Sequence, residues 1–310
     1  MTVALRLPGA SPARIHQALL GAGEGSPLDH DVARRLAQSA PWWPRTVQAQ
    51  RRHAQRMVRH LAIQSGQFLD LGCGLPTAQP VHRIASAIRP SRTVYVDRDA
   101  DVHTAWRIAL AGEPNAAASA VRCDIADIDA LLDEPAVQAL DWTRPISVLL
   151  DDVAHFLDDE TMTRLLAVLR ECLPRGSTIS LTHVLAASRS HPIHPVVQLY
   201  RRAGVGLWPR HLRQVTTWRG SWPAHILQSH DVLPWCAVLM RTPGPSRFLR
   251  PAFWPRAATS RASGREVAAG APAMRPGVTV TAGRTLLGTR PPAAAVGSSR
   301  HRPGDDGRPA

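Results

Sequence analysis

Three aspartates recur along the first half of the chain at equal intervals, each at or near the end of a short apolar run. Asp70, Asp97 and Asp124 follow one another at a spacing of 27 residues. Short runs of this kind are typical of buried parallel strands. Because open α/β sheets bind ligands at the carboxyl ends of their strands, we expect the three carboxylates to meet at one edge of one sheet.

The turn after the first acid contains two glycines, Gly72 and Gly74, which permit a tight turn and a close approach of the backbone to a ligand. The order differs from the dinucleotide fingerprint, in which a third glycine packs helix against strand and the turn holds a pyrophosphate. Here Pro76 stands at the third position. A carboxylate at the turn repels a pyrophosphate but suits a cationic amino group, so the pattern favours S-adenosylmethionine over NAD.

The other two acids suit the rest of that cofactor. Asp97 would accept hydrogen bonds from both ribose hydroxyls at the tip of the neighbouring strand, and Asp124 would accept one from the adenine amino group. The alternative is that both acids cap the helices that follow them. The pattern favours the cofactor for Asp97 and leaves both interpretations open for Asp124.

Net charge does not indicate a nucleic-acid groove in the folded part. Residues 241–310 hold 12 Arg against 3 acids, whereas the other 240 residues hold 25 Arg against 21 acids, so most of the formal charge of +13 lies in the last stretch. The four cysteines show no CxxC spacing, which predicts neither a zinc site nor a disulfide framework. No apolar run reaches the length of a membrane span, and we expect a cytoplasmic protein.

The pattern along the chain predicts three parts. Residues 1–64 are expected to form a helical lid, residues 65–243 a Rossmann-like cofactor-binding domain, and residues 244–310 a disordered tail rich in Arg, Pro and Ala. Strands are expected at 67–71, 93–97, 119–123, 145–150, 177–183 and 234–241. Helices are expected from Ser11 to Gly21, from Asp31, at 46–63, 77–88, 100–111, 127–139, 158–172, 193–203 and 211–218. The arginine stripe of the 46–63 helix, which includes Arg51, is expected to face solvent.

Several stretches resemble a known family. They are Ser11-Pro12-Ala13-Arg14-Ile15, Leu19-Leu20-Gly21, Gln50-Arg51, Phe68-Leu69-Asp70-Leu71-Gly72-Cys73-Gly74-Leu75-Pro76-Thr77, His82, Val94-Tyr95-Val96-Asp97, Arg144-Pro145 and His155-Phe156. On these residues the chain resembles the actinobacterial S-adenosylmethionine-dependent methyltransferase family once known as a domain of unknown function, closely over 10–185 and loosely over 186–243. The resemblance implies a doubly wound, mostly parallel α/β sheet of seven strands, the class I methyltransferase fold, with the last strand antiparallel and an N-terminal helical extension.

The chain departs from that family near its N-terminus. Members typically have a Tyr-Asp-Tyr-like helix end and a Gly-Gly-Lys loop, whereas this chain has His16-Gln17-Ala18 and Gly21-Ala22-Gly23-Glu24-Gly25. If that loop closes over the cofactor or the substrate, its usual polar anchors are missing here.

The chemistry is expected at the end of the fourth strand, where Asp151 and Asp152 precede His155. Either aspartate could contact cofactor or substrate, and His155 could act as a general base if the acceptor carries a proton of high pKa. The alternative for His155 is a histidine bonded to nearby backbone. His183, at the end of the fifth strand, is a weaker candidate of the same kind.

These observations predict an S-adenosylmethionine-dependent methyltransferase that acts on a small molecule by in-line transfer. The catalytic residues are expected to be His155 and Asp152, with no metal. The cofactor-binding residues are expected to be Asp70, Gly72, Gly74, Thr77, Asp97, Arg98, Asp124 and Asp151. The alternative is an inactive cofactor-binding or regulatory module whose arginine-rich tail contacts nucleic acid.

Overall fold

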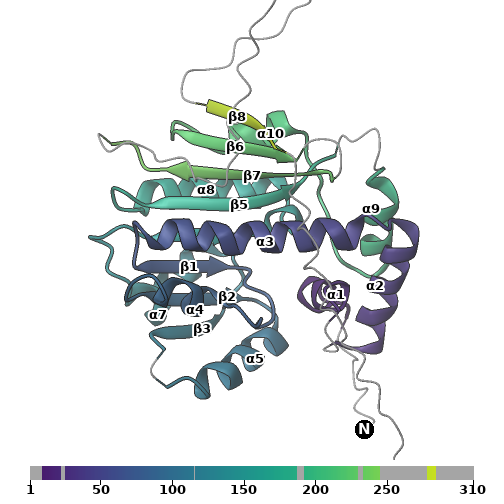
Figure 1. Ribbon diagram of the computed structural model, residues 1–310, viewed down its shortest axis with the longest axis horizontal. Helices are drawn as coiled ribbons and strands as arrows, with labels where there is room; N and C mark the ends of the chain where they lie inside the picture. Colours follow the sequence, from purple (N-terminus) through teal and green to yellow (C-terminus); the bar gives the residue numbers. More distant parts are fainter. Residues whose placement is uncertain are drawn as a thin grey trace, which may run out of the picture.

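A computed structural model describes residues 9–21, 25–114, 116–186, 192–229, 233–244 and 278–283 of the chain. Its centre is one mixed sheet with the strand order β3-β2-β1-β4-β5-β7-β6-β8 (Figure 1). The strands are β1 (Gln67–Leu71), β2 (Arg92–Asp97), β3 (Ala118–Arg122), β4 (Ser147–Leu150), β5 (Thr178–Val184), β6 (Ala224–Ser229), β7 (Trp235–Arg241) and β8 (Val278–Gly283).

The strand directions match the predicted fold over β1–β7. The neighbours from β3 to β5 are all parallel, and β7 is antiparallel to both β5 and β6. The chain leaves β1 toward β2 and β3 on one side and returns through β4 toward β5 on the other. The order therefore reverses between β1 and β4, and the carboxyl ends of these two strands open onto the crevice where such sheets bind ligands.

Helices cover both faces of the sheet, as a doubly wound fold requires. They are α1 (Pro12–Leu19), α2 (Pro27–Ser39), α3 (Trp43–Ala62), α4 (Val81–Ser86), α5 (Ala100–Ala111), α6 (Ile128–Asp133), α7 (Pro135–Gln138), α8 (Asp159–Cys172), α9 (His194–Arg202), α10 (Leu212–Thr217) and the 3₁₀ turn η1 (Ala154–Phe156). Alternate residues of β1 show the two layers: Phe68 packs with α3 and α4, whereas Leu69 and Leu71 pack with α6, α7 and α8. Both sides are apolar because both are buried.

The first two helices pack at the carboxyl end of the sheet beside α9 (Figure 1). Ile15, Leu36, Trp43 and Tyr200 form the buried centre of this cluster. The second helix starts at Pro27 rather than at the predicted Asp31, because Ser26 caps it and Asp29 bonds back to the Ser26 amide.

Three other predictions need correction. The strand β6 was not predicted, since its sequence between Trp222 and Ser229 contains Pro223 and polar residues that break the apolar pattern. The predicted 127–139 helix is two helices, because Pro135 cannot continue the first one and starts the second. The predicted disorder of 244–310 is wrong at 278–283, where β8 pairs in parallel with β6; residues 245–277 and 284–310 lie outside the described residues.

None of the helices in the described segments combines the length and apolarity needed to cross a bilayer.

Candidate active site

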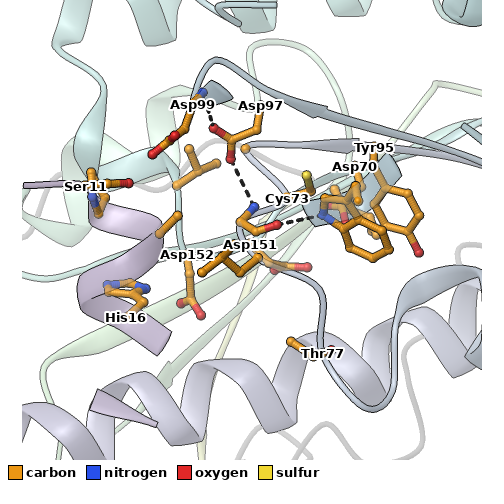
Figure 2. A pocket seen from close by; sticks show the side chains of 18 of the residues that line it. Ser11, His16, Asp70, Cys73, Thr77, Tyr95, Asp97, Asp99, Asp151 and Asp152 are labelled. Atoms are coloured by element: carbon orange, nitrogen blue, oxygen red, sulfur yellow. Dashed lines mark hydrogen bonds between the residues drawn. The ribbon is translucent and has the colours of Figure 1, made fainter. Parts of the chain in front are cut away.

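A cavity of about 570 Å³ lies at the carboxyl edge of the sheet, between the strand ends and the N-terminal helices (Figure 2). All eight residues predicted to hold the cofactor line it, and so does Asp152. Carboxylates that are far apart in the sequence therefore share one space, because parallel strands end at the same edge.

The glycine turn has the backbone conformation that its sequence predicts. Gly72 and Gly74 have φ values of 69° and 64°, which residues other than glycine rarely adopt. The amides of Gly72 and Cys73 both donate to the Val96 carbonyl, at 2.8 and 3.1 Å. A Cβ atom on Gly72 would lie 2.3 Å from Cγ2 of Val153, so the turn after β1 packs directly on the segment after β4.

An aromatic network that the sequence analysis did not identify contacts this turn at Gly74. The Trp106 indole N–H donates to the Gly74 carbonyl at 2.7 Å, and its ring stacks on Tyr95 at a centroid distance of 3.7 Å. The Tyr95 hydroxyl bonds Nδ1 of His82 at 2.8 Å, and His82 Nε2 lies 3.2 Å from a Glu113 carboxylate oxygen. The available signal was the presence of His82 and Tyr95 among the family-like residues.

Asp97 lies at the tip of β2 and is bonded to two loops. One oxygen accepts from the Gly74 amide at 3.1 Å and the other from the Asp99 amide at 3.0 Å. Burial raises the pKa of Asp97 in spite of these two bonds. The helix after β2 is capped by Asp99, so Asp97 is not the cap that the alternative interpretation required.

Asp124 is likewise not the cap of the next helix, because Asp127 is. Its carboxylate accepts from the Ala126 amide at 3.0 Å and pairs with Arg98 across 3.3 Å at the rim of the cavity. The two residues lie on neighbouring loops, and both are more than a third exposed.

Three carboxylates and one guanidinium group lie around the inner wall. Neither carboxylate oxygen of Asp151 has a hydrogen-bond partner among the described residues, although both are shielded from solvent. Burial raises the pKa of Asp151 well above its usual range, and the neighbouring Asp152 and Asp70 add to the shift. Burial also raises the pKa of Asp70 to about 7 and that of Asp152 to about 6, while Arg51 acts in the opposite direction on both.

The position of Arg51 corrects the expectation that its helix face is solvated. Arg52, Arg56 and Arg59 are exposed, but Arg51 lines the cavity. Its Nε is buried and has no hydrogen-bond partner within the described part of the chain. The helix turns by about 100° per residue, so neighbouring arginines of one stripe need not share an environment.

Asp152 is held in a strained conformation. Its φ of 60° is the single positive value that a described residue other than glycine adopts. Its amide donates to the Thr182 hydroxyl at 2.8 Å, and that hydroxyl donates back to the Asp152 carboxylate at 3.2 Å. Strain of this kind persists where the surroundings fix the residue, and it is concentrated at functional sites.

The prediction that His155 faces the substrate is wrong in this structure. The side chain is fully buried and does not belong to the described cavity lining, because the 3₁₀ turn points it toward the core against Phe156 and His183. Neither ring nitrogen has a partner among the described residues, so the backbone-bonded alternative is not observed either. His183 is also fully buried.

A different histidine, which the sequence analysis noted only as a departure from the family, lines the cavity. His16 of α1 is 6% exposed, and its Nε2 has no partner among the described residues. Burial, with the nearby Arg51, lowers the pKa of His16 to about 3, so the ring is neutral at physiological pH. His16 packs edge-on against Phe156, which also lines the cavity.

Arg14 fastens α1 over the outer end of the site. Its guanidinium group bonds Asp29 at 2.7 Å, Asp99 at 3.1 Å and Asp101 at 2.7 Å. Asp29 is fully buried, and Asp99 and Asp101 belong to the loop and helix after β2. One side chain thus joins α1, α2 and the sheet edge.

The carboxylates that line this cavity fit S-adenosylmethionine. The unpartnered Asp151 carboxylate and the neighbouring Asp70 suit the cationic amino and sulfonium groups of that cofactor, and Asp97 lies where a ribose diol would find an acceptor. Within the described residues there is no group of three or more His, Cys, Asp or Glu side chains arranged to hold a metal ion.

Comparisons with known proteins agree with this site. A family model described as S-adenosyl methyltransferase matches residues 4–220. The crystal structure of a DUF574 family protein from Streptomyces avermitilis MA-4680 is 27% identical, with a TM-score of 0.71 over 76% of this chain and 98% of that one. A candidate methyltransferase from Thermobifida fusca YX is 26% identical, with a TM-score of 0.69 over 78% of this chain and 98% of the other. The search of curated proteins gives no match. With its sheet, its acid-lined cavity and this family match, the chain belongs to the S-adenosyl methyltransferase family and is a methyltransferase whose cofactor is S-adenosylmethionine.

Proposed function

We propose that the protein methylates a small organic molecule by in-line transfer within the cavity at the end of β1 and β4. The observation that carries the proposal is the meeting of Asp70, Asp97 and Asp151, from three strand ends, in one cavity of about 570 Å³. This volume suits a cofactor and a small acceptor, and not a macromolecular segment in addition. When bound, S-adenosylmethionine supplies the methyl group to the acceptor.

In this proposal each predicted residue that lines the cavity has a defined part, whereas His155 has none. Asp70 and Asp151 bind the cationic amino acid end, with Gly72 and Gly74 keeping the backbone close. Asp97 binds the ribose, and Asp124 with Arg98 borders the adenine. Thr77 lines the wall near α4, and Asp152 faces the acceptor. Positioning of the acceptor in line with the methyl group supplies most of the rate, because holding two reactants together removes an entropic barrier.

Residues 1–64 act in this proposal as a lid. Residues 9–14 and His16 line the cavity from α1 and the segment before it, and Arg14 ties them to the loop after β2. The cofactor would enter and leave when the ion pairs of Arg14 with Asp99 and Asp101 break.

Calorimetry with S-adenosylmethionine and with NAD tests the cofactor part, and release of S-adenosylhomocysteine in the presence of small-molecule extracts tests the transfer. We expect binding of S-adenosylmethionine alone and release that requires an acceptor. Tight binding of NAD, or no binding of S-adenosylmethionine, would contradict the proposal.

A second candidate is a cofactor-binding module without catalysis. The substitution of His16-Gln17-Ala18 for the family's Tyr-Asp-Tyr-like helix end favours it, because these residues include a cavity-lining side chain. This candidate predicts cofactor binding with no S-adenosylhomocysteine release from any acceptor. If the arginine-rich tail of such a module also contacts nucleic acid, the protein should bind polyanions with an affinity that falls steeply with salt. That affinity should disappear when residues 245–310 are deleted.

A further inference from the structure

The charged groups toward the outer part of the cavity have partners. Arg14 is bonded to Asp29, Asp99 and Asp101, and Arg98 pairs with Asp124. Asp97 accepts two backbone N–H groups. Three inner carboxylates, those of Asp70, Asp151 and Asp152, remain, and the one other cation among the described lining residues is Arg51.

The cofactor leaves one of these carboxylates without a cationic hydrogen-bond partner. In the proposed function, the cationic amino acid end of S-adenosylmethionine lies against Asp70 and Asp151. Asp152 forms no ion pair among the described residues, and its carboxylate accepts a hydrogen bond from the Thr182 hydroxyl. A buried carboxylate is stabilised by a charged partner with good hydrogen-bond geometry, so a cationic group on the acceptor would suit this position.

Of the three inner carboxylates, that of Asp152 lies toward the part of the cavity that α1 borders (Figure 2). Figure 2 shows Asp152 and His16 toward one side of the cavity, and Asp70 and Tyr95 toward the other. The Thr182 hydroxyl fixes one oxygen of Asp152 and leaves the other free to accept from a ligand. The strained φ of 60° shows that the chain keeps this carboxylate at the edge of the cavity at a conformational cost.

His16 is an independent sign of a ligand at the same place. The ring is 94% shielded, lines the cavity and presents an Nε2 with no partner among the described residues. A buried polar atom normally has a hydrogen-bond partner, and a ligand in the cavity would supply one: an N–H donor if Nε2 is the unprotonated nitrogen of the neutral ring. Phe156, packed on His16 at a centroid distance of 5.4 Å, adds an apolar ring for the carbon skeleton of that ligand.

We propose that the methyl acceptor is an amine, bound at a subsite where Asp152 pairs with its nitrogen, His16 Nε2 accepts one of its N–H bonds and Phe156 packs on its carbon skeleton. An alcohol or phenol would offer Asp152 no cationic hydrogen-bond donor. The inference rests on the proposed function, since it names the substrate class of that same site.

The proton balance fits this subsite. The bound ammonium gives one N–H proton to the Asp152 carboxylate, which frees the nitrogen lone pair. That lone pair forms the new C–N bond while the electrons of the broken methyl–sulfur bond stay on sulfur. The product is an N-methylammonium ion, and the proton leaves Asp152 for solvent.

Binding to the product-loaded protein tests the subsite without turnover. The protein is saturated with S-adenosylhomocysteine, which lacks the methyl group, and is titrated with a panel of primary and secondary alkyl and arylalkyl amines. Each amine is paired with its isosteric alcohol, such as 2-phenylethylamine with 2-phenylethanol. We expect at least one amine to bind about tenfold or more tightly than its alcohol, a difference of about 1.4 kcal/mol.

The variants identify the residues. D152N keeps the shape and the Thr182 contact but removes the charge, and we expect it to abolish the preference for amine. H16F keeps a ring against Phe156 but removes Nε2, and we expect a severalfold loss of amine affinity with unchanged affinity for S-adenosylhomocysteine. D129N removes an exposed acid that pairs with Arg164 on the surface, and it should change neither affinity.

The outcomes separate the two proposals. If S-adenosylhomocysteine fails to bind, the proposed function itself is contradicted. If it binds and no amine in the panel is preferred over its alcohol, or if D152N keeps the preference, the amine inference is overturned while the methyltransferase proposal stands.

Discussion

The carboxylate of Asp97 accepts a hydrogen bond from the backbone amide of Gly74 across 3.1 Å, so the tip of β2 holds the glycine turn that follows β1. The acid expected to bind the ribose therefore also shapes the loop expected to approach the methionine end. A loss of Asp97 should affect both parts of the cofactor site.

We predict that D97A weakens S-adenosylmethionine binding by at least about tenfold. Each hydrogen bond to a charged acceptor contributes about 1.5–3 kcal/mol, and the ribose would lose its acceptor while the turn loses its support. D97N, which keeps one acceptor oxygen, should show a smaller loss of S-adenosylmethionine affinity. Calorimetry measures both, with D129A as the surface control. An unchanged affinity in folded D97A would remove Asp97 from the site.

The two glycines of the turn should differ in their tolerance of alanine. A Cβ on Gly72 would overlap Val153 at 2.3 Å, whereas the nearest atom to a Cβ on Gly74 is 4.0 Å away. G74A therefore carries only the cost of a positive φ, about 1–2 kcal/mol, and G72A adds a steric clash of about 1–3 kcal/mol. We expect a larger fall in melting temperature and cofactor affinity for G72A. Equal effects would show that Val153 moves aside freely.

Cofactor affinity should rise with pH. Burial raises the pKa of Asp70 to about 7 and that of Asp152 to about 6, against about 3.9 in the unfolded chain. The folded protein thus binds more protons than the unfolded chain between these values, and the ligand-free protein should lose stability as pH rises through the window. The cationic cofactor favours the ionised carboxylates, so its affinity should increase between about pH 5 and about pH 8.

Calorimetry and thermal melts across that range check both directions. The D70N/D152N double variant should flatten the two pH profiles. Affinity that falls with pH in the unaltered protein would contradict the acid-lined site.

Much of the expected cofactor side of the cavity was predictable because its position depends on strand ends. Asp70, Asp97 and Asp124 lie at or near the ends of apolar runs, and parallel pairing brings such positions to one edge of the sheet. The glycine turn was predictable for a related reason, since two glycines after a strand permit the positive φ values that the turn adopts.

The acceptor side was less predictable because it depends on side-chain direction. His155 and His16 are both histidines near helical segments, and nothing local separates the one that points into the core from the one that lines the cavity. Arg51 belongs to an arginine stripe whose other members are exposed. Edge strand β8 escaped prediction because its short run gains stability from pairing with β6 rather than from its own composition.

The last prediction concerns Arg14, whose side chain is 8% exposed and bonds the fully buried Asp29. Burial alone would raise the pKa of Asp29, but hydrogen bonds from Ser26, Ser11 and Arg14 outweigh it and lower the pKa. R14Q removes the charge opposite a buried carboxylate, and breaking such a pair costs about 3–5 kcal/mol. The matched control is R34Q, an exposed arginine paired with Asp31 on α2, for which about 0–1 kcal/mol is expected.

Denaturant unfolding of both variants, together with hydrogen exchange of α1, measures the difference. We expect R14Q to increase exchange in α1 and to weaken cofactor binding, because α1 forms one wall of the cavity. In the unaltered protein the Asp29 contribution is complete above the unfolded pKa of about 3.9 and is lost as pH falls through the lower folded value. Equal stabilities for R14Q and R34Q would show that Arg14 does not fasten the helix over the site.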